Sequence, residues 1–485
     1  MSRQRMLALT LLATLCGGCA VGPDYHRPAS ANPESYTRTP LPATIGSAAP
    51  TPDAQHLDPS AQISRTWWQV FGSPALNALV QRALEHNPSI QSAQAALRQA
   101  QENVIAQRGA YLPSVQIGYS PSRQKNAVDT ISPTLTSGAA MYTLHTAQLS
   151  IAYAPDVFGL NRRTVESLQA QADTQRFQLE AAYLTLASNV VAAAIQESAL
   201  RAQIDATQDI IAASTRSLSI MRQQASLGGA SGLDVAAQET ALAQAQQSLP
   251  VLQKQLEQTR DLLAVLAGSP PAQGGNEDFE LTGFTLPQAL PLSLPSQLVE
   301  QRPDVRAAEA QVHAASAQVG IALANRLPQF SIAGNYGGSS THFSDMFKQG
   351  NTFWGLTGNL TQTVFDFGTL KHRQRAAEAA LEQSAAQYRT VVLGAFQNVA
   401  DTLYALDADA RTLSAATQAE AAAKKTLQLT RQQLELGFVS GLSLLSAEQA
   451  YQQARVTQIQ AQAARFSDTA ALIQALGGGW QADAP

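Results

Sequence analysis

The stretch RQQASLGGASGLDV, which begins at Arg222, returns as RQQLELGFVSGLSL at Arg431. Its leucine, glycine and serine positions keep their spacing at an offset of 209, which is 431 minus 222. Upstream, NPSIQSAQAAL at Asn87 is similar to RPDVRAAEAQV at Arg302. Similar segments in the same order over most of the chain indicate a tandem duplication.

Each half shows the same series of elements: a helix, two strands, a very long helix, a glycine-containing turn and a returning helix. The long helices are expected over residues 161–225 and 370–436, each about 100 Å long at about 1.5 Å per residue. Apolar residues recur in sevens along them, for example Leu179, Leu186 and Leu200 in the first half. This period predicts coiled coils.

Four strands are expected, at about residues 113–120, 144–154, 328–337 and 353–364. All four alternate, as Val115 and Ile117 do with Gln116. Alternation over such lengths is typical of transmembrane strands, although a soluble sandwich with one buried face is the alternative. Four strands cannot close a membrane barrel, because open edges would leave backbone groups unsatisfied in hydrocarbon. Several copies of the chain are therefore expected to share one barrel.

The first residues read as an export signal. Arg3 and Arg5 precede an apolar core of ten residues, Met6 to Leu15, and small residues lead to Cys19. The pattern predicts a lipoprotein whose Cys19 carries a diacylglycerol and an N-acyl chain, with a plain secretory signal as the alternative. No other cofactor is expected. Cys16 and Cys19 are the two cysteines of the chain, so the mature protein can form no internal disulfide.

Composition excludes several classes of function. Charged residues make up 14% of the chain, the formal net charge is -4, and no run of Lys and Arg suits a nucleic-acid backbone. The seven histidines lack metal-ligand spacing, so no metal site is expected. No glycine-rich phosphate loop is present, and we expect no enzyme. No stretch of 18 consecutive apolar residues predicts a transmembrane helix.

These patterns divide the chain into six parts. They are a signal peptide (1–18), a lipidated extended arm (19–66), a first repeat (67–268), a linker (269–293), a second repeat (294–478) and a tail (479–485).

Several stretches resemble a known family, the TolC-like outer-membrane efflux factors, and within it the NodT-type lipoproteins of resistance-nodulation-division (RND) pumps. The matching stretches cover nearly the whole mature chain in the family's order. They are CAVGPDYHRP from Cys19, WWQVFGSPALNALVQRALEHNP from Trp67, DVFGLNRR from Asp156, LPSQLVEQRPDVRAAE from Leu294, VFDFG from Val364 and ALGGGW from Ala475.

The resemblance implies an α + β membrane protein. Its long coiled-coil helices would form a periplasmic α-barrel, and its four strands would enter a twelve-stranded transmembrane β-barrel shared by a homotrimer. It also implies three further partners: a periplasmic adaptor, an inner-membrane RND-type pump and outer-membrane lipid. The protein would lie in the outer membrane, lipid-anchored, and extend into the periplasm.

The resemblance further implies that the hairpin tips dock the adaptor, and we expect these turns to expose few long side chains. Asp234 and Val439 are expected at an aperture, although Gly437–Leu444 contains no carboxylate. The pair Arg162 and Arg163 is expected to contact lipid head groups or to cap the adjacent turn. The docking residues implied are Leu227, Gly228, Ser231, Leu233, Leu436, Gly437 and Ser440.

The sequence therefore predicts a passive exit duct for drugs or other small molecules, fed by an inner-membrane pump. A duct for metal efflux or type I protein secretion is one alternative. A non-conducting periplasmic coiled-coil scaffold is another, and the alternating strands argue against it.

Overall fold

The computed structural model describes residues 20–28, 35–39, 42, 44–45, 54–125, 141–275, 277–292 and 295–479. Cys19 and the expected signal peptide lie outside the described residues. The chain divides into two compact units, each made of separated segments. Unit 1 holds the segments through Pro28, Leu97–Gln175 and Ala308–Tyr388, and unit 2 holds Ala29–Ala96, Arg176–Ala307 and Arg389–Pro485.

The two halves of the chain form helices of matching length. α4 (Leu160–Ser226) and α8 (Thr369–Glu435) have 67 residues each, and the helices that return from them, α5 (Gly232–Leu266) and α9 (Gly441–Ala475), have 35 each. The expected ends of the long helices are off by one residue. Equal helix lengths in both halves confirm the duplication that the repeated glycine turns predict.

Shorter helices precede the strands in both halves. α2 (Pro74–His86) and α3 (Pro88–Arg108) come before the first strand pair, and α6 (Pro295–Gln301) and α7 (Pro303–Ala324) come before the second. Each begins with a proline, which suits the first helical turn because its missing N–H would have no partner there.

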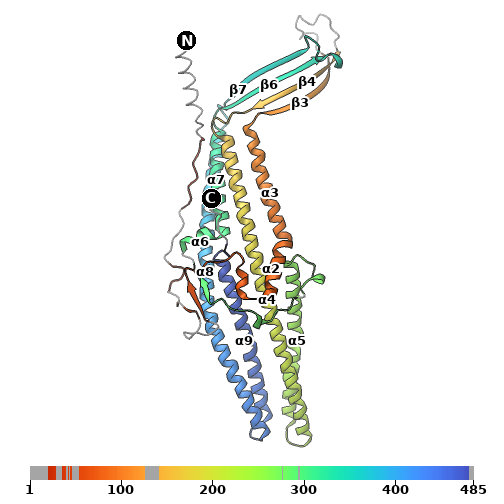
Figure 1. Ribbon diagram of the computed structural model, residues 1–485, viewed down its shortest axis with the longest axis vertical. Helices are drawn as coiled ribbons and strands as arrows, with labels where there is room; N and C mark the ends of the chain where they lie inside the picture. The colour runs from red at the N-terminus through yellow and green to blue at the C-terminus, as the bar shows by residue number, and fades with distance from the viewer. Residues whose placement is uncertain are drawn as a thin grey trace. The chain divides into compact units, whose positions relative to one another are not determined.

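A four-stranded antiparallel sheet forms the strand-bearing end of unit 1. Its order is β3 (Ser114–Lys125), β4 (Met141–Tyr153), β6 (Gln329–Ser340) and β7 (Thr352–Thr361). Figure 1 shows the four strands side by side. β3 runs five residues past its expected end and β7 stops three residues short. The β4–β6 pairing joins the two halves of the chain in one sheet.

Unit 2 has an aromatic core around the short 3-10 helix η1 (Trp67–Phe71). Trp67 is 2% exposed, and its ring lies 6.5 Å from that of Phe71, which in turn lies 6.3 Å from Phe466 of α9. Packing of these rings holds the start of the first repeat against the end of the second. Burial of such large side chains is the main stabilising contribution here.

A second, small sheet in unit 2 joins the arm to the linker. β2 (Gln55–Asp58) pairs antiparallel with β1 (Thr44–Ile45) and parallel with β5 (Ala289–Pro291). The expected extended arm therefore includes ordered strands. Four further 3-10 turns complete the described elements: η2 (Gly109–Tyr111), η4 (Pro271–Gln273), η5 (Leu281–Gly283) and η6 (Phe343–Asp345).

Glu197, which interrupts the apolar seam of α4, is fully buried. Its carboxylate accepts hydrogen bonds from the Phe279 backbone N–H at 3.2 Å and from Arg260 Nε at 3.4 Å. Burial raises the pKa of Glu197, and the bonds from Phe279 and Arg260 oppose that rise. The carboxylate of Glu197 therefore connects the linker to the part of α4 that lies in unit 2.

Among the described residues one helix, α4, contains an 18-residue window apolar enough to cross a membrane, with a mean hydropathy of 1.2. The apolar side chains of α4 include Val190, Val191 and Ala194, which are buried in the core of unit 2. Core packing accounts for the part of this window that is buried, which is 44%.

Candidate functional site

Strand register places most of the large apolar side chains of the four strands on one face of the sheet, whereas Leu144 and Phe353 lie on the other. Ile117 lies opposite Leu149, Leu149 opposite Tyr336, and Tyr336 opposite Trp354. Directly paired residues share a face, so these four side chains form one row across the sheet. The alternation of apolar and polar residues in the four strands is therefore in phase across the sheet.

A polar row runs beside the apolar one on the other face. Gln116 lies opposite Ser150, Ser150 opposite Asn335, and Asn335 opposite Gly355. The apolar row is open to its surroundings: Ile117 is 86% exposed and Trp354 77% exposed. A large exposed apolar face is unfavourable in water and favourable against lipid.

The strands have the length that a membrane requires. They contain 12, 13, 12 and 10 residues in the order β3, β4, β6 and β7, and about 9 to 11 tilted residues cross a bilayer. Within the described sheet, β3 and β7 each have one edge without a neighbouring strand. Their open edges can pair with strands of another copy.

The first hairpin tip, between α4 and α5, is built around Gly228 and Ser231. Gly228 has φ of 80°, a left-handed conformation that glycine adopts without a steric cost. Ser231 caps α5: its hydroxyl accepts a hydrogen bond from the Asp234 N–H, and Asp234 accepts one from the Ser231 N–H at 3.0 Å. Hydrogen bonds from Ser231 lower the pKa of Asp234. The carboxylate proposed for an aperture thus has a local capping role.

The second tip, between α8 and α9, repeats the turn without the carboxylate. Gly437 has φ of 78°, and Ser440 caps α9 by accepting a hydrogen bond from the Ser443 N–H at 3.4 Å. Val439 is half-buried. A serine stands where the first tip has Asp234, so this cap is uncharged.

The expectation that the tips expose few long side chains is wrong. Leu227, Leu233 and Leu436 are exposed, and Phe438, which is not among the expected docking residues, is 77% exposed. A large aromatic residue between two turn glycines was the available signal, because a short turn offers no core in which to bury it. Each tip thus presents apolar side chains around an exposed glycine turn.

Polar contacts between α4 and α9 join the two hairpins within unit 2. Arg455 Nη1 lies 2.9 Å from Asp209 Oδ2, and Ser217 Oγ donates to Glu448 Oε1 at 3.0 Å. Close to the tips, Gly441 packs on Met221 so tightly that an added Cβ would lie 2.5 Å from the methionine methyl group. Any separation of the hairpin tips must break these contacts.

In unit 1 the arm that follows Cys19 is bound by Arg163, which is 4% exposed. Arg163 Nε donates to the Val21 carbonyl at 3.1 Å, and Nη2 donates to Asp24 at 2.8 Å. Hydrogen bonding to Arg163 lowers the pKa of Asp24. Arg163 therefore holds the arm rather than lipid head groups, and Asp156 caps the turn by accepting from the Arg162 N–H at 2.8 Å.

Aromatic stacking extends this contact along the arm. The ring of Tyr25 stacks on His313 of α7 with centroids 4.3 Å apart, and its hydroxyl donates to Glu309 at 3.3 Å. Burial, followed by the charge of Glu309, raises the pKa of Tyr25. Gly22 lies so close to α7 that an added Cβ would be 2.5 Å from Gly320 Cα. The segment GPDY is thus shaped to fit α4 and α7.

Strands with one apolar face, joined to long helices with apolar hairpin tips, define a class of protein: an outer-membrane channel subunit with a helical periplasmic part. The model of the outer membrane efflux protein family matches residues 79–269 and again residues 294–478. The chain belongs to this outer membrane efflux protein family. Members are transport components rather than enzymes, and this chain is an outer-membrane component of an efflux system.

Several named proteins are similar in sequence to this chain over nearly its full length. The pyoverdine export outer membrane protein OpmQ of Pseudomonas putida is 31% identical over 456 residues, which are 92% of this chain and 95% of the relative. The toluene efflux pump outer membrane protein TtgC of Pseudomonas putida is 27% identical over 98% of this chain and 96% of its own. The solved outer-membrane channel OprN superposes with a TM-score of 0.84 at 26% identity, covering 96% of this chain and 100% of OprN.

Proposed function

We propose that three copies of this chain assemble a passive exit duct, in which each copy contributes four strands to one twelve-stranded barrel. The observation that carries the proposal is the in-phase register from Ile117 to Trp354, which gives the sheet one lipid-compatible face. Closure between β7 of one copy and β3 of the next would pair both open edges. A closed barrel is required because unpaired backbone groups are costly in hydrocarbon.

The partners would be a periplasmic adaptor and an inner-membrane RND-type pump. The apolar tips support docking to the adaptor, with Leu227, Gly228, Ser231, Leu233, Leu436, Gly437 and Ser440 at the contact and Phe438 added to them. Asp234 and Val439 would border the aperture, which opens when the hairpins move outward. That movement would break the Asp209–Arg455 pair and the contact between Ser217 and Glu448.

The cargo would be small organic molecules. Relatives carry the names of pyoverdine export, toluene efflux and antibiotic efflux proteins, which favours organic compounds over metal ions or secreted proteins. The energy would come from the pump, since the duct itself only conducts.

The protein would be attached to the outer membrane in two ways, through lipid on Cys19 and through the strands. Tight binding of residues 21–25 to α4 and α7 supports a fixed path for the arm next to that cysteine. Cys19→Ser should remove the lipid and leave a membrane-embedded protein. Complete release of this variant into the periplasm would count against the barrel.

The test is reconstitution of the purified full chain in a planar lipid bilayer, with native mass spectrometry of the same sample. The expected result is a trimer that produces stepwise conductance. A monomer that stays soluble without detergent, or an assembled trimer without conductance, would overturn the proposal and favour a scaffold.

A further inference from the structure

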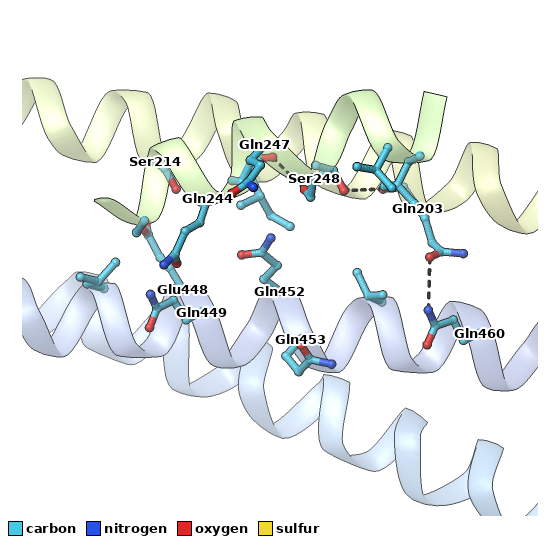
Figure 2. Close-up of a pocket in the computed structure, with 18 of the residues that line it drawn as sticks. Gln203, Ser214, Gln244, Gln247, Ser248, Glu448, Gln449, Gln452, Gln453 and Gln460 are labelled. Carbon is cyan, nitrogen blue, oxygen red and sulfur yellow. Dashed lines mark hydrogen bonds between the residues drawn. The ribbon is translucent and has the colours of Figure 1, made fainter. Parts of the chain in front are cut away.

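A cleft of about 700 Å³ lies in unit 2 between α4, α5 and α9. Figure 2 shows amide side chains of α5 and α9 reaching into it from opposite sides. It is separate from the hairpin turns and from the arm site in unit 1. Its volume is in the range of small-molecule sites, about 300 to 1,000 Å³.

The lining is mainly uncharged and rich in hydrogen-bonding groups. Eight glutamines and three hydroxyl side chains contribute to it, and apolar side chains such as Ile210 and Leu252 form the rest together with Glu448. Gln460 Nε2 donates to Gln203 Oε1 at 3.3 Å across the cleft, from α9 to α4. Each amide group both donates and accepts hydrogen bonds. Because glutamine side chains are long and flexible, they can adapt to different polar groups.

Glu448 is the one ionisable residue among the residues that line the cleft. It is 7% exposed, and its Oε1 accepts from Ser217 Oγ at 3.0 Å and from Arg431 Nη2 at 3.3 Å. Within the described part of the chain its Oε2 is buried and accepts no hydrogen bond. A buried carboxylate oxygen without a donor is costly, and a cationic donor that reaches it from the cleft would relieve that cost.

We propose that this cleft binds small organic molecules that carry an ammonium or guanidinium group, with Glu448 accepting from the cation and the glutamines contacting the remainder. Anions are disfavoured because none of the described residues that line the cleft is basic. Adaptable amides would give broad selectivity and modest affinity. This site goes beyond the proposed duct, because binding can be measured whether or not the protein conducts.

The experiment titrates dansylcadaverine, a fluorescent primary amine, into the purified full chain in lipid nanodiscs and follows fluorescence anisotropy. Its N-acetylated, uncharged derivative is titrated in parallel, and empty nanodiscs correct for partition into lipid. Glu448→Gln should weaken binding of the amine at least about fivefold, because a charge-assisted hydrogen bond is replaced by a neutral one. Glu239→Gln on α5, which removes an exposed carboxylate outside the cleft, should leave binding unchanged.

A second variant keeps the test decisive if Glu448→Gln unfolds. Ser248→Trp places a large side chain in the cleft from an exposed position on α5 and should abolish binding while circular dichroism stays unchanged. Three outcomes would each overturn the inference. The amine could bind all variants with equal affinity, the acetylated derivative could bind as tightly as the amine, or neither could bind because a partner subunit covers the cleft. A protein that binds the amine yet conducts no ions would refute the duct alone.

Discussion

Arg163 and Asp24 lie 139 positions apart in sequence, and the Nη2 of Arg163 donates a 2.8 Å hydrogen bond to the carboxylate of Asp24. The guanidinium also reaches the carbonyls of Val21 and Gly22 and the carboxylate of Glu166. One buried side chain thereby orders the segment that follows Cys19. An arginine suits this role because its rigid, planar guanidinium offers five N–H donors.

We expect Arg163→Ala to free the arm. Its four acceptors lose their donor, so amide exchange over residues 21–25 should accelerate at least about tenfold, since such a loss is worth over about 1.4 kcal/mol of local opening free energy. Hydrogen-exchange mass spectrometry measures this change. Arg162→Ala, which removes an exposed neighbour, is the matched control, and unchanged exchange in Arg163→Ala would show that other contacts hold the arm.

The two faces of the sheet should differ in their tolerance of charge. Ile117→Lys places a charge in the apolar row and should cost about 2 to 4 kcal/mol of membrane stability near mid-bilayer, whereas Gln116→Lys lies on the polar face and should cost little. Heat-modifiable electrophoretic mobility of protein folded into lipid vesicles measures the folded fraction. Equal folding of the two variants would contradict the assignment of faces.

Asp468 of α9 should make stability depend on pH. Burial, reinforced by the neighbouring carboxyl of Asp409, raises the pKa of Asp468 to about 6. A raised carboxyl pKa means that the protonated form is favoured on folding, so its contribution is fully present below about pH 4 and is lost as pH rises through about 6.

Asp468→Asn should therefore stabilise the protein at pH 7.5 by about 1 to 2 kcal/mol, after allowance for solvent screening of a half-buried group. The gain should shrink towards pH 4. Thermal unfolding followed by circular dichroism at both pH values measures it. Asp205→Asn, an exposed carboxylate on α4, serves as the control, and a gain that does not vary with pH would rule out this titration.

The apolar tips should decide adaptor binding. Leu436→Ser combined with Phe438→Ser removes two exposed apolar side chains from the second tip and should weaken adaptor binding at least about tenfold, since buried apolar anchors dominate interfaces. Biolayer interferometry with the periplasmic adaptor measures the affinity. Val265→Ser, an exposed apolar position at the far end of α5, should bind as the wild type does. Full affinity in the double variant would remove Phe438 from the interface.

Periodic and local features could be predicted from the sequence. The heptad seams and paired glycine turns predicted α4 and α8 to within one residue at each end, because helix formation and turn chemistry depend on neighbours in the chain. The alternation of Val115 and Ile117 predicted a two-faced strand. The partners of Arg163 were not predicted, because they depend on what lies nearby in space, whereas the exposure of Phe438 had a local signal in its place between two turn glycines.

By itself, the sequence determined the duplication, the helices, the alternating strands and the efflux-protein resemblance. All of these depend on residue types and their spacing along the chain. Only the tertiary structure decided that β4 pairs with β6, which brings Leu149 opposite Tyr336 and aligns the apolar row. Only the tertiary structure also placed Asp24 on Arg163 and Glu448 beside a cleft lined with amides. These contacts join residues more than a hundred positions apart, and no short-range pattern records which distant partner a buried charge will find.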